Sequence, residues 1–239
     1  MVKVLILGDV HGSWQALNLV MVKAMEKHPD LTAFVQVGDF GYSWPGRQPF
    51  NFDKRFWDDD LRKKAEQLAF YWLDGNHENH DQLDLDQGAY QMNMIYKSRG
   101  SINHFYAADF TPRRAMFFGG TTSPDFYLRI QGASWWPQES IKYSQIAEAL
   151  KVEPPLDIIF SHDHPLAFPY KKYNNSYGEA DQAFLDVLRE HFKPKLWVFG
   201  HHHDFKSGET CGTQWMCAPI IESRMAILWD GYTLTPIQV

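Results

Sequence analysis

The stretch VKVLILGDVHG, residues 2–12, joins a short apolar run to a cluster of polar residues. Its aliphatic and β-branched side chains leave no polar face, which is typical of a strand buried within a parallel sheet. Asp9 and His11 follow the run directly. Open α/β sheets bind their ligands beyond the carboxyl ends of the strands, so this junction is predicted to be part of a functional site.

The same pattern recurs along the chain. Apolar runs that end in Gly, Asp, Asn or His are found at FVQVGD (34–39), AFYWLDGNH (69–77), AMFFGG (115–120), LDIIFSH (156–162) and KLWVFGH (195–201). Each run has the length and composition of a buried strand. Parallel strands therefore place these polar residues at one edge of the fold.

Amphipathic segments alternate with these runs, at residues 13–28, 59–70, 138–151 and 178–192. Ser13 is the predicted N-cap of the first helix. The acids Asp58, Asp59 and Asp60 are more typical of a helix start than of a metal cluster. Strand–helix alternation over the first 80 residues indicates an α/β protein.

The C-terminal region, residues 213–237, lacks a helical period and predicts three short strands, with turns at Glu222–Ser223 and Asp230–Gly231. Two long irregular segments, 41–58 and 163–178, are expected to face the substrate. No repeat, low-complexity tract or linker divides the 239 residues, so we predict a single domain over residues 1–239.

The composition limits the possible partners. A hydrophobic content of 44% supports a sizeable core, and the net charge is −6. Without a global basic field, stable binding to long nucleic acid is not expected, and a small substrate is favoured.

The two cysteines, Cys211 and Cys217, lie on a stretch predicted to be a strand. We expect two buried free thiols in a reducing compartment. The N-terminal run is too short for a signal peptide, and no run approaches the length of a membrane span. We therefore expect a soluble cytoplasmic protein with no membrane partner.

The predicted strand ends gather carboxylates, imidazoles and one amide: Asp9, His11, Asp39, Asn76, His77, His162, His201, His202 and His203. Oxygen and imidazole ligands suit Mn, Zn, Fe, Co or Ni rather than a thiolate-bound metal. Seven or more ligands are too many for one ion. A pair of ions about 3.5–4 Å apart, joined by a carboxylate, activates water for displacement at phosphorus.

Five motifs carry a family resemblance. They are GDVHG (8–12), GDFG (38–41), GNHE (75–78), SHDHP (161–165) and GHHH (200–203). Their order and spacing resemble those of the calcineurin-like metallophosphoesterases, and the match spans residues 8–203. The segment 119–139 is similar to one seen in a bacterial and phage branch of this family. The resemblance implies a four-layer αββα sandwich, in which two mixed β-sheets are flanked by helices.

The resemblance also implies a set of ligands for two divalent or trivalent ions, with manganese favoured. The first ion would be held by Asp9, His11 and His203, the second by Asn76, His162 and His201, and Asp39 would bridge both. Alternation along an extended segment would let His201 and His203 point the same way, and His202 elsewhere.

The resemblance gives His77 a catalytic role: it would contact the phosphoryl group and protonate or stabilise the leaving oxygen. A carboxylate on the strand of Asp39, Asp74 or Glu78 could orient its proton. Arg129 is the candidate cation for the phosphate oxygens, because its guanidinium forms paired hydrogen bonds. The alternative for Arg129 is an exposed salt bridge.

The remaining histidines and two adjacent tryptophans are expected to have structural roles. His28, His104 and His191 lie outside the motifs and are predicted to be structural. His80 and His164 lie near motifs but are expected to be structural rather than part of the site. Trp135 and Trp136 could stack on a base, but core packing is favoured.

The implied reaction is phosphoester hydrolysis, in which a hydroxide that bridges the two ions attacks phosphorus in line. In the branch that acts on phosphoproteins the second motif is GDxxDRG, whereas this chain has GDFGYSWPG (38–46). A nucleotide, cyclic nucleotide or other small phosphodiester is therefore the favoured substrate, with a phosphomonoesterase or protein phosphatase as the alternative. A non-catalytic scaffold is a third possibility. Tyr42, Trp44, Phe50 and Phe168 could hold a base or aryl group.

Overall fold

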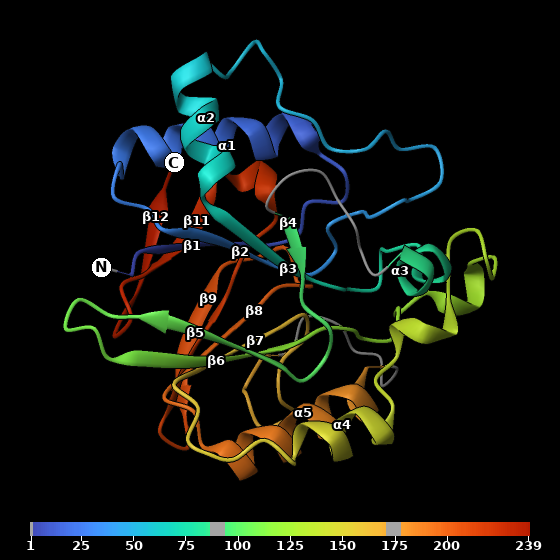
Figure 1. The fold of residues 1–239 in the computed structure, drawn as a ribbon. Coiled ribbons are helices and arrows are strands. Elements are labelled where there is room, and N and C mark those ends of the chain that lie inside the picture. The colour runs from blue at the N-terminus through green and yellow to red at the C-terminus, as the bar shows by residue number, and fades with distance from the viewer. Residues whose placement is uncertain (1, 87–93, 171–177) are drawn as a thin grey trace.

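The computed structural model describes residues 2–86, 94–170 and 178–239. The opening apolar run forms β1 near the middle of a six-stranded sheet (Figure 1). The strands of this first sheet are, in spatial order, β12 (Leu234–Gln238), β11 (Met225–Trp229), β1 (Val4–Leu7), β2 (Ala33–Val37), β3 (Ala69–Leu73) and β4 (Met94–Tyr96). β1 to β4 are parallel, and β11 and β12 are antiparallel additions at one edge.

The second sheet also has six strands. In spatial order these are β5 (Ser101–Tyr106), β6 (Pro112–Phe118), β7 (Ile158–Ser161), β8 (Leu196–Phe199), β10 (Thr213–Cys217) and β9 (Lys206–Thr210). The four central strands are parallel, and the two edge strands are antiparallel to their neighbours. Both sheets are therefore mixed, with parallel strands at the centre.

Alternation along β1 divides its side chains between two layers. Val4 and Ile6 pack in the core between the sheets, whereas Leu5 and Leu7 pack in the core beneath the helices. All four side chains are fully buried, and burying a residue of this kind is worth about 1.5–3 kcal/mol. A strand that must fill two cores is apolar on both faces, as the sequence pattern predicted.

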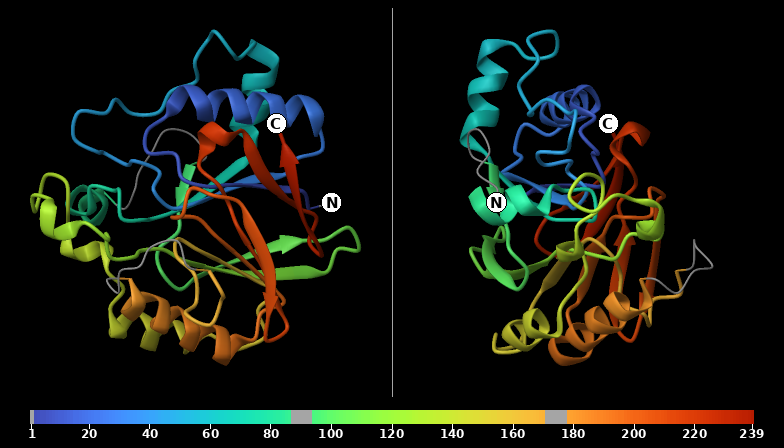
Figure 2. Two further views of the ribbon diagram at one scale, coloured as in Figure 1. Left: turned by 180° about the vertical axis from the view of Figure 1, so that it is seen from behind. Right: turned by 90° about the vertical axis from the view of Figure 1, so that its right-hand side faces the viewer.

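Helices cover both outer faces (Figure 2). α1 (Trp14–Lys27) and α2 (Asp59–Gln67) lie over the first sheet, and α4 (Tyr143–Ala149) and α5 (Glu179–Phe192) lie over the second. The short helix α3 (His80–Asp86) lies to one side of the sheets. The predicted αββα sandwich is confirmed.

Most predicted elements are found within a few residues of their expected bounds, including the three strands of the C-terminal region. Asp58 caps α2, because its carboxylate accepts a hydrogen bond from the Leu61 N–H at 2.7 Å. Ser13 precedes α1, but its hydroxyl bonds Glu222 and caps no N–H. Ser13 therefore occupies the predicted N-cap position, but its side chain does not cap the helix.

The helix predicted over 138–151 is present, but its predicted start is wrong. The structure has a 3₁₀ turn at Pro137–Glu139, and α4 begins only at Tyr143. Glu139 is fully buried and accepts hydrogen bonds from Ser123 and Trp135. Because the Glu139 carboxylate accepts these hydrogen bonds in the interior, it cannot lie on the solvent-facing side of a helix. The amphipathic pattern is therefore interrupted at Glu139.

The cysteines are both free. Cys217 lies in β10 and is buried, as expected. Cys211, in contrast, is exposed in the turn between β9 and β10, so the prediction of a buried strand thiol is wrong for that residue. Over the described residues, no helix has the length and apolar character needed to cross a membrane.

Candidate metal centre

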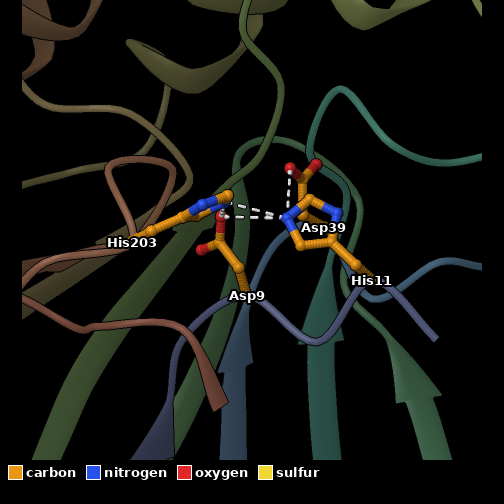
Figure 3. A group of neighbouring side chains, drawn as sticks. All are labelled: Asp9, His11, Asp39 and His203. Atoms are coloured by element: carbon orange, nitrogen blue, oxygen red, sulfur yellow. Dashed lines mark hydrogen bonds and ion pairs between the residues drawn. The ribbon is translucent and has the colours of Figure 1, made fainter. Parts of the chain in front are cut away.

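The segments that follow β1, β2 and β8 bring their polar residues to one place (Figure 3). Asp9, His11, Asp39 and His203 offer ligand atoms that all lie within 4.8 Å of one another. The Nε2 atoms of His11 and His203 are 2.9 Å apart, and Asp9 Oδ2 lies 3.0 Å from His203 Nε2. These four residues, the first group, match the predicted first ligand set together with its bridge.

A second group combines Asp39 with His162 and His201, again with ligand atoms within 4.8 Å. His162 Nε2 lies 3.3 Å from Asp39 Oδ1 and 3.1 Å from Asn76 Oδ1. Asp39 therefore belongs to both groups, with Oδ1 toward His162 and Oδ2 toward His11. All seven predicted ligands lie in or beside these two groups.

Left-handed backbone is concentrated at these residues. His11, Asp39, His201 and His203 have φ between 48° and 66°, a conformation uncommon outside glycine. Such backbone persists where neighbouring contacts hold it, and it is frequent at functional sites. One such contact is the hydrogen bond from the His201 N–H to Asp9 Oδ1, at 2.8 Å.

The extended conformation predicted for residues 201–203 is therefore wrong. The three histidines form a bend, in which left-handed His201 and His203 flank His202. His201 lies beside His162, and His203 lies beside His11. His202 turns into the interior, where its Nε2 lies 3.1 Å from Asp163 Oδ1. His202 belongs to neither of the two groups.

Close packing beside Asp39 requires a glycine at the start of GNHE. A Cβ at Gly75 would collide with the Asp39 carboxylate and backbone N–H. With that space kept free, the neighbouring loop approaches closely enough for the His77 N–H to donate to Asp39 Oδ1 at 2.7 Å.

The first group has the chemistry of a cation site. Asp9 Oδ2 is buried and accepts no well-formed hydrogen bond, although buried carboxylate oxygens are normally paired. The Nε2 atoms of His11 and His203 lie 2.9 Å apart and can hold at most one proton between them, so at least one of them presents a lone pair at this point. Imidazole nitrogens and carboxylate oxygens around one point suit Mn, Zn or Fe. The residues present thus fit a metal ion.

The two histidines of the second group differ in pKa. Burial lowers the pKa of His162, but Asp39 and Asp9 outweigh burial and raise it to about 10. Burial lowers the pKa of His201 to about 3, so its imidazole is neutral at neutral pH. Burial disfavours the Asp39 charge, but His162 and His77 hold the pKa of that carboxyl well below its usual range. In the metal-free protein, a proton on His162 supplies the positive charge that the carboxylates require.

His77 and Arg129 meet at the edge of the first group. Arg129 Nη2 lies 3.0 Å from His77 Nε2, and the His77 ring centroid lies 4.6 Å from that of His11. Burial lowers the pKa of His77 to about 4. Since arginine keeps its proton, Arg129 is the donor and His77 Nε2 is the acceptor. Arg129 also forms a salt bridge with Asp125 at 2.8 Å, so both the salt bridge and the contact with His77 are present.

The carboxylate expected to orient the His77 ring is not found among the described residues. Asp74 instead pairs with Arg99 at 2.6 Å. Glu78 accepts hydrogen bonds from the Phe40 and Gly41 N–H groups. The ring of Trp44 stacks on His77, with centroids 5.0 Å apart and planes 21° apart.

The aromatic residues proposed to hold a base divide into two kinds. Tyr42, Phe50 and Phe168 are buried in the helix-facing cores, so for them the prediction is wrong. Trp44 is partly exposed beside His77 and is available for such a role. The irregular segment 163–178 lies partly outside the described residues.

Other residues near the motifs support the loops. His80 is buried, and its Nε2 lies 3.1 Å from the Gly75 carbonyl oxygen. The Nδ1 of His164 lies 2.8 Å from the Pro165 carbonyl oxygen. Sequence reasoning missed the buried residues Ser123, Asp163 and Glu139. Asp163 could have been noticed as an acid between two histidines in SHDHP; Ser123 carried no comparable signal.

Comparison with known proteins agrees with this geometry. The family model described as calcineurin-like phosphoesterase matches residues 2–205. The chain belongs to this family. Membership of the calcineurin-like phosphoesterases implies that it is a phosphoric ester hydrolase. No curated protein matches the sequence.

Solved structures share the fold at low identity. The protein TT1561 of Thermus thermophilus is 14% identical with a TM-score of 0.57, and the match covers 99% of this chain and 98% of that one. GAP50 of Plasmodium is 15% identical with a TM-score of 0.56, covering 98% and 83%. A putative 5′-nucleotidase of Staphylococcus aureus is 13% identical with a TM-score of 0.55, covering 99% and 53%. At these identities the likeness concerns the fold alone.

Proposed function

We propose that this calcineurin-like phosphoesterase is a dinuclear metal-dependent enzyme that hydrolyses small phosphodiesters. The observation that carries the proposal is the position of Asp39, whose two carboxylate oxygens face two different groups of imidazoles. A carboxylate shared in this way is what two neighbouring cations require.

The ligands follow from the two groups. Asp9, His11 and His203 hold the first ion, and Asn76, His162 and His201 hold the second. Oxygen and imidazole donors make manganese our first choice, with iron, zinc, cobalt and nickel as alternatives. When bound, the pair of ions supplies an activated water molecule and neutralises charge on the phosphate.

Two further residues act on the substrate. Arg129 binds the non-bridging phosphate oxygens, because a guanidinium presents two parallel N–H donors. His77 is neutral at neutral pH. Because its Nε2 accepts from Arg129, its proton lies on Nδ1, and this N–H would stabilise the leaving oxygen as a hydrogen-bond donor.

The preference for a diester rests on the second motif and on Trp44. The segment GDFGYSWPG lacks the DRG of the phosphoprotein-directed branch, and it places Trp44 on the His77 ring. An indole there can stack on an aryl or base group of the leaving alcohol. The net charge of −6 favours a small substrate over long nucleic acid. The two free cysteines fit a cytoplasmic enzyme.

The test compares turnover of an aryl phosphodiester with turnover of the matching monoester, with manganese supplied and Asp39→Ala as the metal-site control. We expect the diester to be cleaved faster by the natural chain and neither substrate by the variant. Cleavage of the monoester alone would make the protein a phosphomonoesterase. Fewer than one bound ion per chain after reconstitution would favour a non-catalytic scaffold.

A further inference from the structure

The segment between β6 and α4 lies outside the five motifs, yet it reaches the loop that carries GNHE. The Gly120 N–H donates to the Asp74 carbonyl oxygen at 2.8 Å, just before that loop. Arg99 strengthens the junction, because it pairs with Asp74 and donates to the carbonyl oxygens of Gln138 and Glu139. Both ends of the segment are thus fixed to the loop.

Within this segment Ser123 contacts Asn76 directly. Asn76 Nδ2 donates to Ser123 Oγ at 3.1 Å, and both side chains are buried. The other end of the amide, Oδ1, lies 3.1 Å from His162 Nε2 at the second group. Asn76 therefore has its NH₂ group toward Ser123 and its oxygen toward the ligands.

Glu139 fixes the position of Ser123. Its Oε1 accepts from the Ser123 backbone N–H at 2.6 Å and from the Trp135 indole N–H at 3.0 Å. Held in this way, Ser123 presents its Oγ as the acceptor for the Asn76 NH₂ group, and the amide oxygen is left to face the second group.

The direction matters for a cation. An amide turned by 180° would point two N–H groups at the place where an oxygen ligand is needed, and a cation would be repelled. Outer hydrogen bonds that orient a ligand in this way typically change metal affinity about 10–100-fold.

We propose that Ser123, held by Glu139, is a positioning residue that presents the Asn76 oxygen to the second cation. The proposal rests on the dinuclear centre proposed above. It adds to that centre a residue outside the motifs, 47 positions from Asn76 in the sequence.

The test is Mn²⁺ binding by metal-free protein, measured by titration calorimetry. In Ser123→Ala we expect the second ion to bind about 10–100-fold more weakly, while the first binds as in the natural chain. Thr122→Val is the matched control. It removes a neighbouring hydroxyl that bonds Asp181 and Ser140, so it perturbs the same segment and should leave both affinities unchanged.

An Asn76→Asp background provides the conservative check. A carboxylate has oxygen at both ends and needs no orientation, so Ser123→Ala should weaken the second ion much less there. If Ser123→Ala fails to fold, Ser123→Cys takes its place, because the thiol is close in size but a weak acceptor. Natural affinity for both ions in a folded Ser123 variant would overturn this proposal alone. A natural chain that binds fewer than two ions would overturn the dinuclear centre as well.

Discussion

His202 Nε2 lies 3.1 Å from Asp163 Oδ1, and both side chains are buried. His202 is the middle residue of the bend that carries His201 and His203, and Asp163 directly follows His162. Asp163 also accepts hydrogen bonds from Thr121, Gln182 and its neighbour's backbone N–H. The pair therefore ties together the two loops that carry three of the proposed ligands.

Replacing His202 should loosen this tie. We expect His202→Ala to lower the free energy of unfolding by about 2 kcal/mol, because a buried carboxylate loses one of its donors. His202→Gln, whose Nε2 can replace the lost donor, should recover part of the loss. Urea denaturation of metal-free protein measures both. Equal stability of the alanine variant and the natural chain would contradict a supporting role for the pair.

Asp39→Ala should release both ions, because Asp39 faces both groups. We expect the metal content after reconstitution to fall from about two ions per chain to below one. Elemental analysis of the dialysed protein checks this, with Asp60→Ala, at an exposed position of α2, as control. Unchanged metal content would remove Asp39 as the bridge.

His77→Ala should keep both ions and lose turnover. The ring contacts Arg129, Trp44 and His11, but His77 belongs to neither ligand group. We expect kcat to fall about 10²–10⁴-fold, with metal content unchanged. Steady-state kinetics and elemental analysis on the same sample separate the two effects, and His104→Ala, at an exposed histidine of β5, is the control. Full activity would exclude His77 from the mechanism.

Glu139 predicts a pH dependence of stability. Burial raises the pKa of its carboxyl from 4.5 to about 7. The folded protein therefore holds this proton more tightly than the unfolded chain does, and the resulting stability is complete below pH 4.5 and lost as the pH rises to about 7. The loss amounts to about 3 kcal/mol.

Glu139→Gln should remove this pH dependence of stability, because the amide does not ionise. We expect the unfolding free energy of the natural chain to fall relative to that of the variant as the pH rises from 4.5 to 8, both measured on metal-free protein. A constant difference across that range would mean that Glu139 does not titrate as its burial implies.

Much of the fold could be predicted from local sequence pattern. Residues 4–7 fill two cores, so they are apolar on both faces, and such runs identify buried strands without knowledge of their partners. The αββα arrangement of those strands came from the family resemblance. Asp9, Asp39 and His162 follow their strands within two residues, so their common location follows from the polarity of parallel strands.

Contacts across the fold decided the rest. The periodicity over 138–151 is helical, but Glu139 accepts hydrogen bonds from Ser123 and Trp135 in the interior. The helix therefore begins only at Tyr143. Three adjacent histidines look equivalent in the sequence. The left-handed backbone of His201 is held by Asp9, 192 positions away in the sequence, and the ring of the middle residue, His202, is turned toward Asp163.

The sequence by itself determined which residues stand at the strand ends, because strand length and apolar pattern are local properties. Only the tertiary structure decided which end of the Asn76 amide faces the ligands and which histidine turns inward. Those outcomes depend on hydrogen bonds between segments far apart in the chain, and no local pattern encodes such partners.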